Sequence, residues 1–165
     1  MKQLFVIRHA KSSWDIAGQS DFERPLNERG HRDAPQMAGR LFKSGTRLDA
    51  LVSSPANRAL TTAQYFAEAF DFKKKDIITV DRLYHASAET FYDVIAGELK
   101  DKWDSVAIFS HNPGITYFAN SLGVVQMDNM PTCGIIGVKA DIKSWADFAK
   151  AGKEFLLIDY PKKIS

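Results

Sequence analysis

The sequence has very little cysteine and no long apolar run, and each absence excludes a class of protein. Cys133 is the single cysteine among 165 residues, so no disulfide can form within the chain, which fits a reducing compartment. No segment approaches the roughly 18 consecutive apolar residues of a membrane span. The apolar run at the N-terminus ends at Arg8, too early for a signal peptide. We therefore expect a cytoplasmic protein without a membrane partner.

The sequence also lacks an excess of charge of either sign. Its 22 basic and 20 acidic side chains give a formal net charge of +2. Proteins that bind nucleic acids or membrane surfaces usually carry a basic excess, so the charge balance supports neither partner. Any attraction for an anion must come from local clustering. The length and the 45% apolar composition are typical of one globular domain, which we expect to span residues 1–165.

Apolar residues follow two alternating periods along the chain. Short apolar runs predict strands at 4–7, 48–52, 77–80, 106–109, 134–138 and 155–160. Helical spacing predicts helices that include 34–41, 59–70, 91–99 and 115–122. This alternation indicates an α/β fold, a three-layer α/β/α sandwich around a mostly parallel sheet. The last two strands lack a long helix between them, so we expect them to be antiparallel and the sheet to be mixed. Cys133 is interpreted as a buried strand residue.

Histidine and arginine residues follow three of the predicted strands. Arg8 and His9 come after the first strand, Arg58 follows the second, and His111 follows the strand at 106–109. In an open α/β sheet, ligands bind beyond the carboxyl ends of the strands. If these strands are parallel neighbours, the four side chains converge on one site.

The residue types at these strand ends favour an anionic ligand. Guanidinium groups bind phosphate oxygens in bidentate fashion. Arg58 is expected in the first turn of a helix and His111 just before another, where free N–H groups favour negative charge. A metal site would need carboxylates or thiolates beside the histidines, and His31 and His85 have no ligand-like spacing. We expect neither a metal nor a cofactor.

The motifs resemble those of a known family. The segments 6–10, 53–63 and 110–112 resemble the histidine phosphatase superfamily, also called phosphoglycerate-mutase-like. The short chain and the segments 20–26 and 83–86 resemble its small SixA-type phosphohistidine phosphatase branch. Ala10 departs from the glycine that many members of the superfamily carry.

The resemblance implies a two-step reaction on a histidine. His9 would attack phosphorus and become a phosphohistidine, which water then hydrolyses. The second ring nitrogen of His9 would donate to a backbone carbonyl. Arg8, Arg58 and His111 would hold the phosphoryl oxygens, and Arg24 would be an additional phosphate contact.

Two carboxylates, Asp21 and Glu89, are candidates for the acid that protonates the leaving group. Asp21 occupies the acidic position before Arg-Pro-Leu in the SixA-type pattern, so we expect it to donate or accept a proton. Glu89 is the nearest analogue in chain order of the loop carboxylate that larger members use. Glu89 also has a simpler interpretation, because a carboxylate in the first turn of a helix complements the helix dipole.

The substrate is predicted from the apparent openness of the site. No long insertion forms a lid, so a phosphorylated protein side chain, in particular phosphohistidine, can reach the pocket. A small phosphomonoester such as a sugar phosphate is the alternative substrate, and a phosphate-binding interaction module without turnover is the alternative of another class. The chain is too short to enclose a small substrate as a mutase would.

Overall fold

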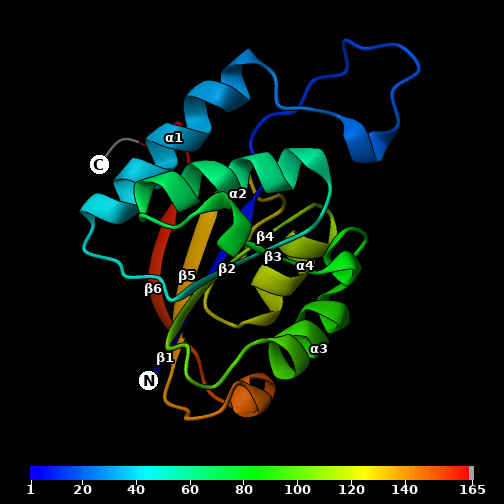
Figure 1. Ribbon diagram of the computed structural model, residues 1–165. Coiled ribbons are helices and arrows are strands. Elements are labelled where there is room, and N and C mark those ends of the chain that lie inside the picture. The colour runs from blue at the N-terminus through cyan, green and yellow to red at the C-terminus, as the bar shows by residue number, and fades with distance from the viewer. Residues whose placement is uncertain (164–165) are drawn as a thin grey trace.

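A six-stranded sheet forms the centre of the protein, whose computed structural model describes residues 1–163 (Figure 1). The strands are β1 (Lys2–Arg8), β2 (Ala50–Ser53), β3 (Ile78–Thr79), β4 (Ser105–Ser110), β5 (Ile135–Ala140) and β6 (Glu154–Asp159). The α-helices are α1 (Glu28–Lys43), α2 (Asn57–Ala69), α3 (Ala88–Glu98) and α4 (Gly114–Ser121). Short 3-10 helices are η1 (Asp21–Glu23), η2 (Lys74–Asp76), η3 (Asp81–Leu83) and η4 (Trp145–Lys150).

The strand order β3-β2-β4-β1-β5-β6 confirms the predicted mixed sheet. The first four strands of this order pair in parallel, whereas β5 pairs antiparallel with both β1 and β6. β4 lies between β1 and β2. The carboxyl ends of the three strands that precede Arg8-His9, Arg58 and His111 are therefore neighbours.

Helices cover both faces of the sheet, as the apolar runs predicted (Figure 1). Leu4 and Val6 of β1 belong to the core beneath α3, α4 and η4, whereas Phe5 and Ile7 belong to the core beneath α1 and α2. All four side chains are at most 1% exposed. This burial on both faces is the reason why the run is continuously apolar instead of alternating.

Polar caps and glycines set the helix ends. The side chain of Asn27 accepts a hydrogen bond from Gly30 N at the start of α1, and Ser87 accepts one from Thr90 N at the start of α3. Gly45 and Gly123 follow α1 and α4 with φ angles of +90° and +79°. These backbone conformations favour glycine and end the two helices.

One sequence expectation needs correction. Cys133 is buried, but it lies in the turn before β5 with a φ angle of +56°, so it is not a strand residue. The turn brings Cys133 N to 2.9 Å from His9 O. The polar segment 11–25 contains η1, and its residue Ser12 forms an isolated bridge with Leu26.

Candidate active site

A cavity of about 460 Å³ lies where the three strand ends meet. The imidazole rings of His9 and His111 are 5.2 Å apart between centroids. Arg58 is the second residue of α2 and reaches the same cavity from the other side of β4. The lining residues are Arg8, His9, Lys11, Ser12, Trp14, Asp21, Arg24, Arg58, Tyr84, His85, His111, Asn112 and Thr132. The convergence predicted from the strand ends is therefore present.

His9 is held in the form that a nucleophile needs. Its Nδ1 lies 2.7 Å from Ala10 O, and because a carbonyl accepts, Nδ1 carries the proton and Nε2 keeps its lone pair. The side chain is 7% exposed, and this burial lowers the pKa of His9 to about 3, with further lowering by the cationic Arg8, Arg58 and Arg24. The imidazole is therefore neutral at physiological pH.

Two buried N–H donors in this cavity have no partner. Arg8 Nη1 donates to Met130 O at 2.7 Å, but Arg8 Nε has no acceptor. His111 Nε2 lies 2.7 Å from Ser54 Oγ, and His111 Nδ1 has no partner. Within residues 1–163, these are the only buried side-chain polar atoms without a hydrogen bond. Since native proteins pair nearly all buried polar groups, the two atoms mark positions where a bound molecule would find free polar partners.

Asp21 is surrounded by hydrogen-bond donors. Arg58 Nη2 and Tyr84 Oη donate to Asp21 Oδ2 at 3.0 and 2.6 Å, and Arg24 Nη1 donates to Oδ1 at 3.0 Å. The Tyr84 hydroxyl and both guanidinium groups hold the pKa of Asp21 well below its usual range. The Asp21 carboxylate therefore stays ionised and positions Arg58 and Arg24. This environment opposes a role for Asp21 as proton donor.

Arg24 is fixed by the loop that carries it. The guanidinium is 7% exposed, donates from Nε to Ser13 O at 3.1 Å, and also contacts Ser12 Oγ. The Trp14 ring stacks on it at 3.2 Å from centroid to Cζ. A stacked, hydrogen-bonded guanidinium in the wall of the cavity has the geometry expected of a phosphate contact.

Glu89 is not brought to the site. It lies in the first turn of α3, is exposed, and does not line the cavity. This position agrees with the simpler interpretation, in which its carboxylate complements the N-terminal end of the helix capped by Ser87.

Sequence reasoning missed Tyr84 and His85 as site residues. Both line the cavity, and their rings lie against each other with centroids 3.9 Å apart and planes tilted by 32°. They follow β3 and η3, so the strand-end rule, if applied to the short run at 77–80, would have placed them near the site. Trp14 was missed because an exposed aromatic residue in a polar loop gives no periodic signal.

The described part of the chain contains no group of three metal-ligating side chains. The neighbours of His9 and His111 are instead guanidinium groups, a donor set that suits an anion and repels a cation. Within residues 1–163, no helix is long and apolar enough to cross a membrane.

The family model of the histidine phosphatase superfamily (branch 1) matches residues 4–114. The match covers more than half of the sequence and contains each strand end described above, so the chain belongs to this superfamily. The phosphoglycerate-mutase-like fold that the motifs implied is thereby confirmed.

The chain is similar to the small SixA-type branch of the family. A candidate phosphohistidine phosphatase SixA from Agrobacterium tumefaciens is 27% identical, with a TM-score of 0.78 and coverage of 97% of this chain and 98% of that one. The protein histidine phosphatase SixA in complex with tungstate has the same fold, at 21% identity, a TM-score of 0.80 and coverage of 96% and 97%.

Two relatives are similar in sequence. An uncharacterised chloroplastic protein of Arabidopsis thaliana is 26% identical over 92% of this chain and 72% of its own length. Phosphoserine phosphatase 1 of Hydrogenobacter thermophilus is 32% identical over 62% of this chain, and the match spans 47% of that enzyme. Together with the family, these matches support a phosphatase.

Proposed function

We propose that the protein is a metal-independent phosphatase that transfers a phosphoryl group to His9 Nε2 and then to water. The observation that carries the proposal is the pair of unpartnered buried donors, Arg8 Nε and His111 Nδ1, in the same cavity as a neutral histidine. A phosphoryl group supplies acceptor oxygens for both donors and an electrophile for His9.

The hydrogen bond at Ser54 supports a defined protonation of His111. Ser54 Oγ accepts from Ala56 N at 3.2 Å, so its own proton can be donated to His111 Nε2, 2.7 Å away. The proton on His111 then resides on Nδ1, the atom without a partner. His111 would thus donate to a phosphoryl oxygen as a neutral imidazole.

In the first step, the His9 Nε2 lone pair forms a bond to phosphorus while the bond to the leaving group breaks. Arg8, Arg58, Arg24 and His111 stabilise the charge on the phosphoryl oxygens, the main contribution that a protein makes to this reaction. In the second step, water attacks phosphorus, orthophosphate leaves, and the electron pair of the P–N bond returns to His9.

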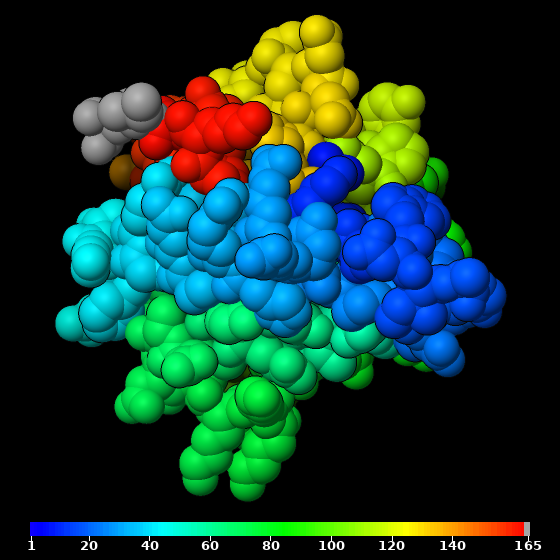
Figure 2. Space-filling model, turned by 90° about the horizontal axis from the view of Figure 1, so that it is seen from above, coloured from blue at the N-terminus to red at the C-terminus, as the bar shows by residue number. Residues whose placement is uncertain are grey.

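We infer that the preferred substrate is a phosphohistidine on a protein. The loop 11–25 projects from the body of the molecule beside the site, as its blue colour shows in Figures 1 and 2. Its apolar residues Trp14, Ile16 and Phe22 are 74%, 56% and 40% exposed. Apolar groups exposed at the mouth of a pocket suit contact with a partner surface.

A basic hollow beside the pocket supports the same substrate. It has a volume of about 490 Å³ and shares Arg8, Lys11 and Thr132 with the catalytic cavity. Its other charged lining residues are Arg29 and Lys162, so every charged group that lines it is a cation. Acidic side chains around the phosphorylated residue of a partner would meet opposite charge here.

The similarity to a phosphoserine phosphatase favours a second candidate substrate, a small phosphomonoester. The rate constants on a phosphohistidine-bearing protein and on small esters such as phosphoserine separate the two. We expect kcat/KM to be higher on the protein, and a much higher value on the small ester would reverse the assignment.

The nucleophile is tested by His9→Ala, with His31→Ala as the matched control. His31 lies on α1 and pairs with Tyr65, outside the cavity. We expect wild type and the control to form an acid-labile phosphoenzyme and to turn over, and His9→Ala to do neither. Absence of turnover and of phosphoenzyme in the wild type would instead support the interaction module, and activity in His9→Ala would refute the nucleophile.

A further inference from the structure

We infer that His85 is the residue that exchanges the proton of the leaving group. The inference rests on the proposed phosphatase function. It assigns to His85 the proton exchange with the leaving group, which neither Asp21 nor Glu89 is placed to perform. Asp21 is held as an anion by three donors, and Glu89 does not line the cavity.

The position of His85 suits a leaving group. In phosphoryl transfer the attacking and leaving atoms lie roughly in line through phosphorus. His9 is buried, so a leaving group opposite its Nε2 points away from the sheet and toward the open mouth of the cavity. His85 is exposed and lines that same cavity, next to Tyr84, whose ring also meets His111 edge-on.

Two packing contacts hold the segment that carries His85 against the site. Ser110 Oγ, at the end of β4, donates to Leu83 O at 2.6 Å. Gly114, at the start of α4, touches Ala86: a Cβ at position 114 would lie 1.8 Å from Ala86 O. Residues on either side of His85 are therefore fixed to the strand and helix that flank His111.

No other side chain in the cavity is suited to exchange a proton. Guanidinium groups do not release theirs, and the neutral His9 and His111 are engaged as nucleophile and oxygen donor. The Tyr84 hydroxyl already donates to Asp21. The ammonium group of Lys11 has N–H donors but no acceptor, so it cannot take a proton from the attacking water. The imidazole of His85 can both donate and accept a proton, which leaves His85 for this role.

One proton transfer accompanies each of the two steps. As His9 Nε2 bonds to phosphorus, the electron pair of the breaking P–O bond goes to the leaving oxygen, which takes the proton of the His85 imidazolium. The neutral His85 next accepts a proton from the water that attacks phosphorus. This transfer restores the imidazolium, and the electron pair of the P–N bond returns to His9.

Esters with different leaving groups test this role in His85→Gln, because kcat/KM reports the first step. We expect kcat/KM to fall by about 100-fold on phenyl phosphate, whose leaving group needs a proton, and to stay near the wild-type value on p-nitrophenyl phosphate. A phosphohistidine protein should resemble p-nitrophenyl phosphate, because its imidazole can leave already protonated. His31→Gln, a substitution of the same type outside the cavity, should match wild type on all three.

The outcomes separate the inference from the function on which it rests. Equal losses on all three substrates, or no loss on any, in an active wild type would overturn the role of His85 alone. Failure of the wild type to turn over any of them would overturn the proposed function and the inference together. Unchanged thermal unfolding of His85→Gln would show that a selective loss is chemical.

Discussion

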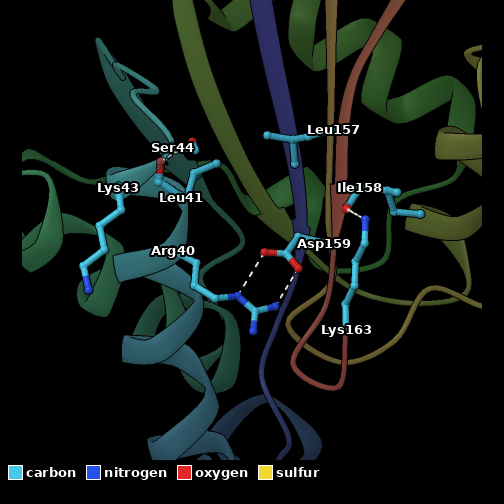
Figure 3. Close-up of a pocket in the computed structure, with 8 residues that line it drawn as sticks. All are labelled: Arg40, Leu41, Lys43, Ser44, Leu157, Ile158, Asp159 and Lys163. Atoms are coloured by element: carbon cyan, nitrogen blue, oxygen red, sulfur yellow. Dashed lines mark hydrogen bonds and ion pairs between the residues drawn. The ribbon is translucent and has the colours of Figure 1, made fainter. Parts of the chain in front are cut away.

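Two cavities of almost equal size differ in what their arginines contact. The catalytic cavity measures about 460 Å³, and the one between α1 and β6 about 440 Å³. In the second cavity Arg40 donates from Nε and Nη2 to Asp159 at 3.1 and 2.5 Å (Figure 3). Arg40 Nη2 also donates to Tyr160 O at 2.6 Å. In the first, Arg8 Nε has no acceptor.

The two cavities therefore differ in whether their arginine donors are satisfied and not in their volume. Arg40 is neutralised by a carboxylate in bidentate geometry, so an incoming anion would have to displace Asp159. Arg8 carries a buried N–H without an acceptor among the described residues. The ion pair at Arg40 therefore joins β6 to α1, whereas Arg8 has a donor left for the oxyanion that we propose as its ligand.

The largest expected effect is the loss of kcat/KM when Arg8 is replaced by alanine, with Arg40→Ala as the comparison. Arg8→Ala removes a donor aimed at the transferred group and should lower kcat/KM by about 100- to 1,000-fold. Arg40→Ala should leave kcat/KM unchanged and lower the free energy of unfolding by about 1 kcal/mol, as expected for a partly exposed ion pair. Steady-state kinetics and urea denaturation measure both quantities. Loss of activity in Arg40→Ala would remove the distinction between the cavities.

A smaller effect should appear in the pH dependence of stability. The pKa of His9 is about 3 in the folded protein against an ordinary value of 6.5, so the unfolded chain binds a proton that the folded chain does not as the pH falls below 6.5. His9 therefore stabilises the fold above that pH, and its contribution should shrink by about 2 kcal/mol between pH 7 and pH 5.

Urea denaturation of wild type and His9→Asn at both pH values measures this contribution. We expect the stability loss on acidification to be about 2 kcal/mol smaller in the variant. An identical loss in the two proteins would mean that His9 titrates normally in the fold and that burial among Arg8, Arg58 and Arg24 does not keep it neutral.

The smallest effect should follow removal of the charge on Asp21. Asp21→Asn keeps one acceptor oxygen but ends the charge pairing that positions Arg58 and Arg24, so kcat/KM should fall by about tenfold on every substrate. A loss confined to substrates with poor leaving groups would assign the acid to Asp21, as the SixA-type pattern first suggested, and would count against His85. Measurement of kcat/KM for Asp21→Asn on phenyl phosphate and on p-nitrophenyl phosphate distinguishes these two outcomes.

The sequence predicted the parts of the molecule that depend on local pattern. The continuous apolar run at 4–7 indicated a strand buried on both faces, and the strand-end rule placed His9, Arg58 and His111 at one site. These predictions succeeded because burial and connection topology leave a clear periodic signature.

The remaining features depend on contacts between distant loops, which no local pattern records. The Asp21 carboxylate accepts hydrogen bonds from Arg24, three residues away in the sequence, and from Arg58 and Tyr84, which are 37 and 63 positions away. The turn at Cys133 likewise includes a hydrogen bond to the distant His9 O. Assigning a proton to Asp21 from its position alone therefore overlooked the donors that keep it ionised.

The insertion of β4 between β1 and β2 also has a consequence for synthesis. β1 and β2 do not pair with each other, so His9 and Arg58 come into register only when residues 105–110 have left the ribosome and entered the sheet. Until then the cationic residues of a nascent chain have no shared pocket. The cavity is thus complete only when β4 is in place, and its formation during refolding would time the placement of that strand.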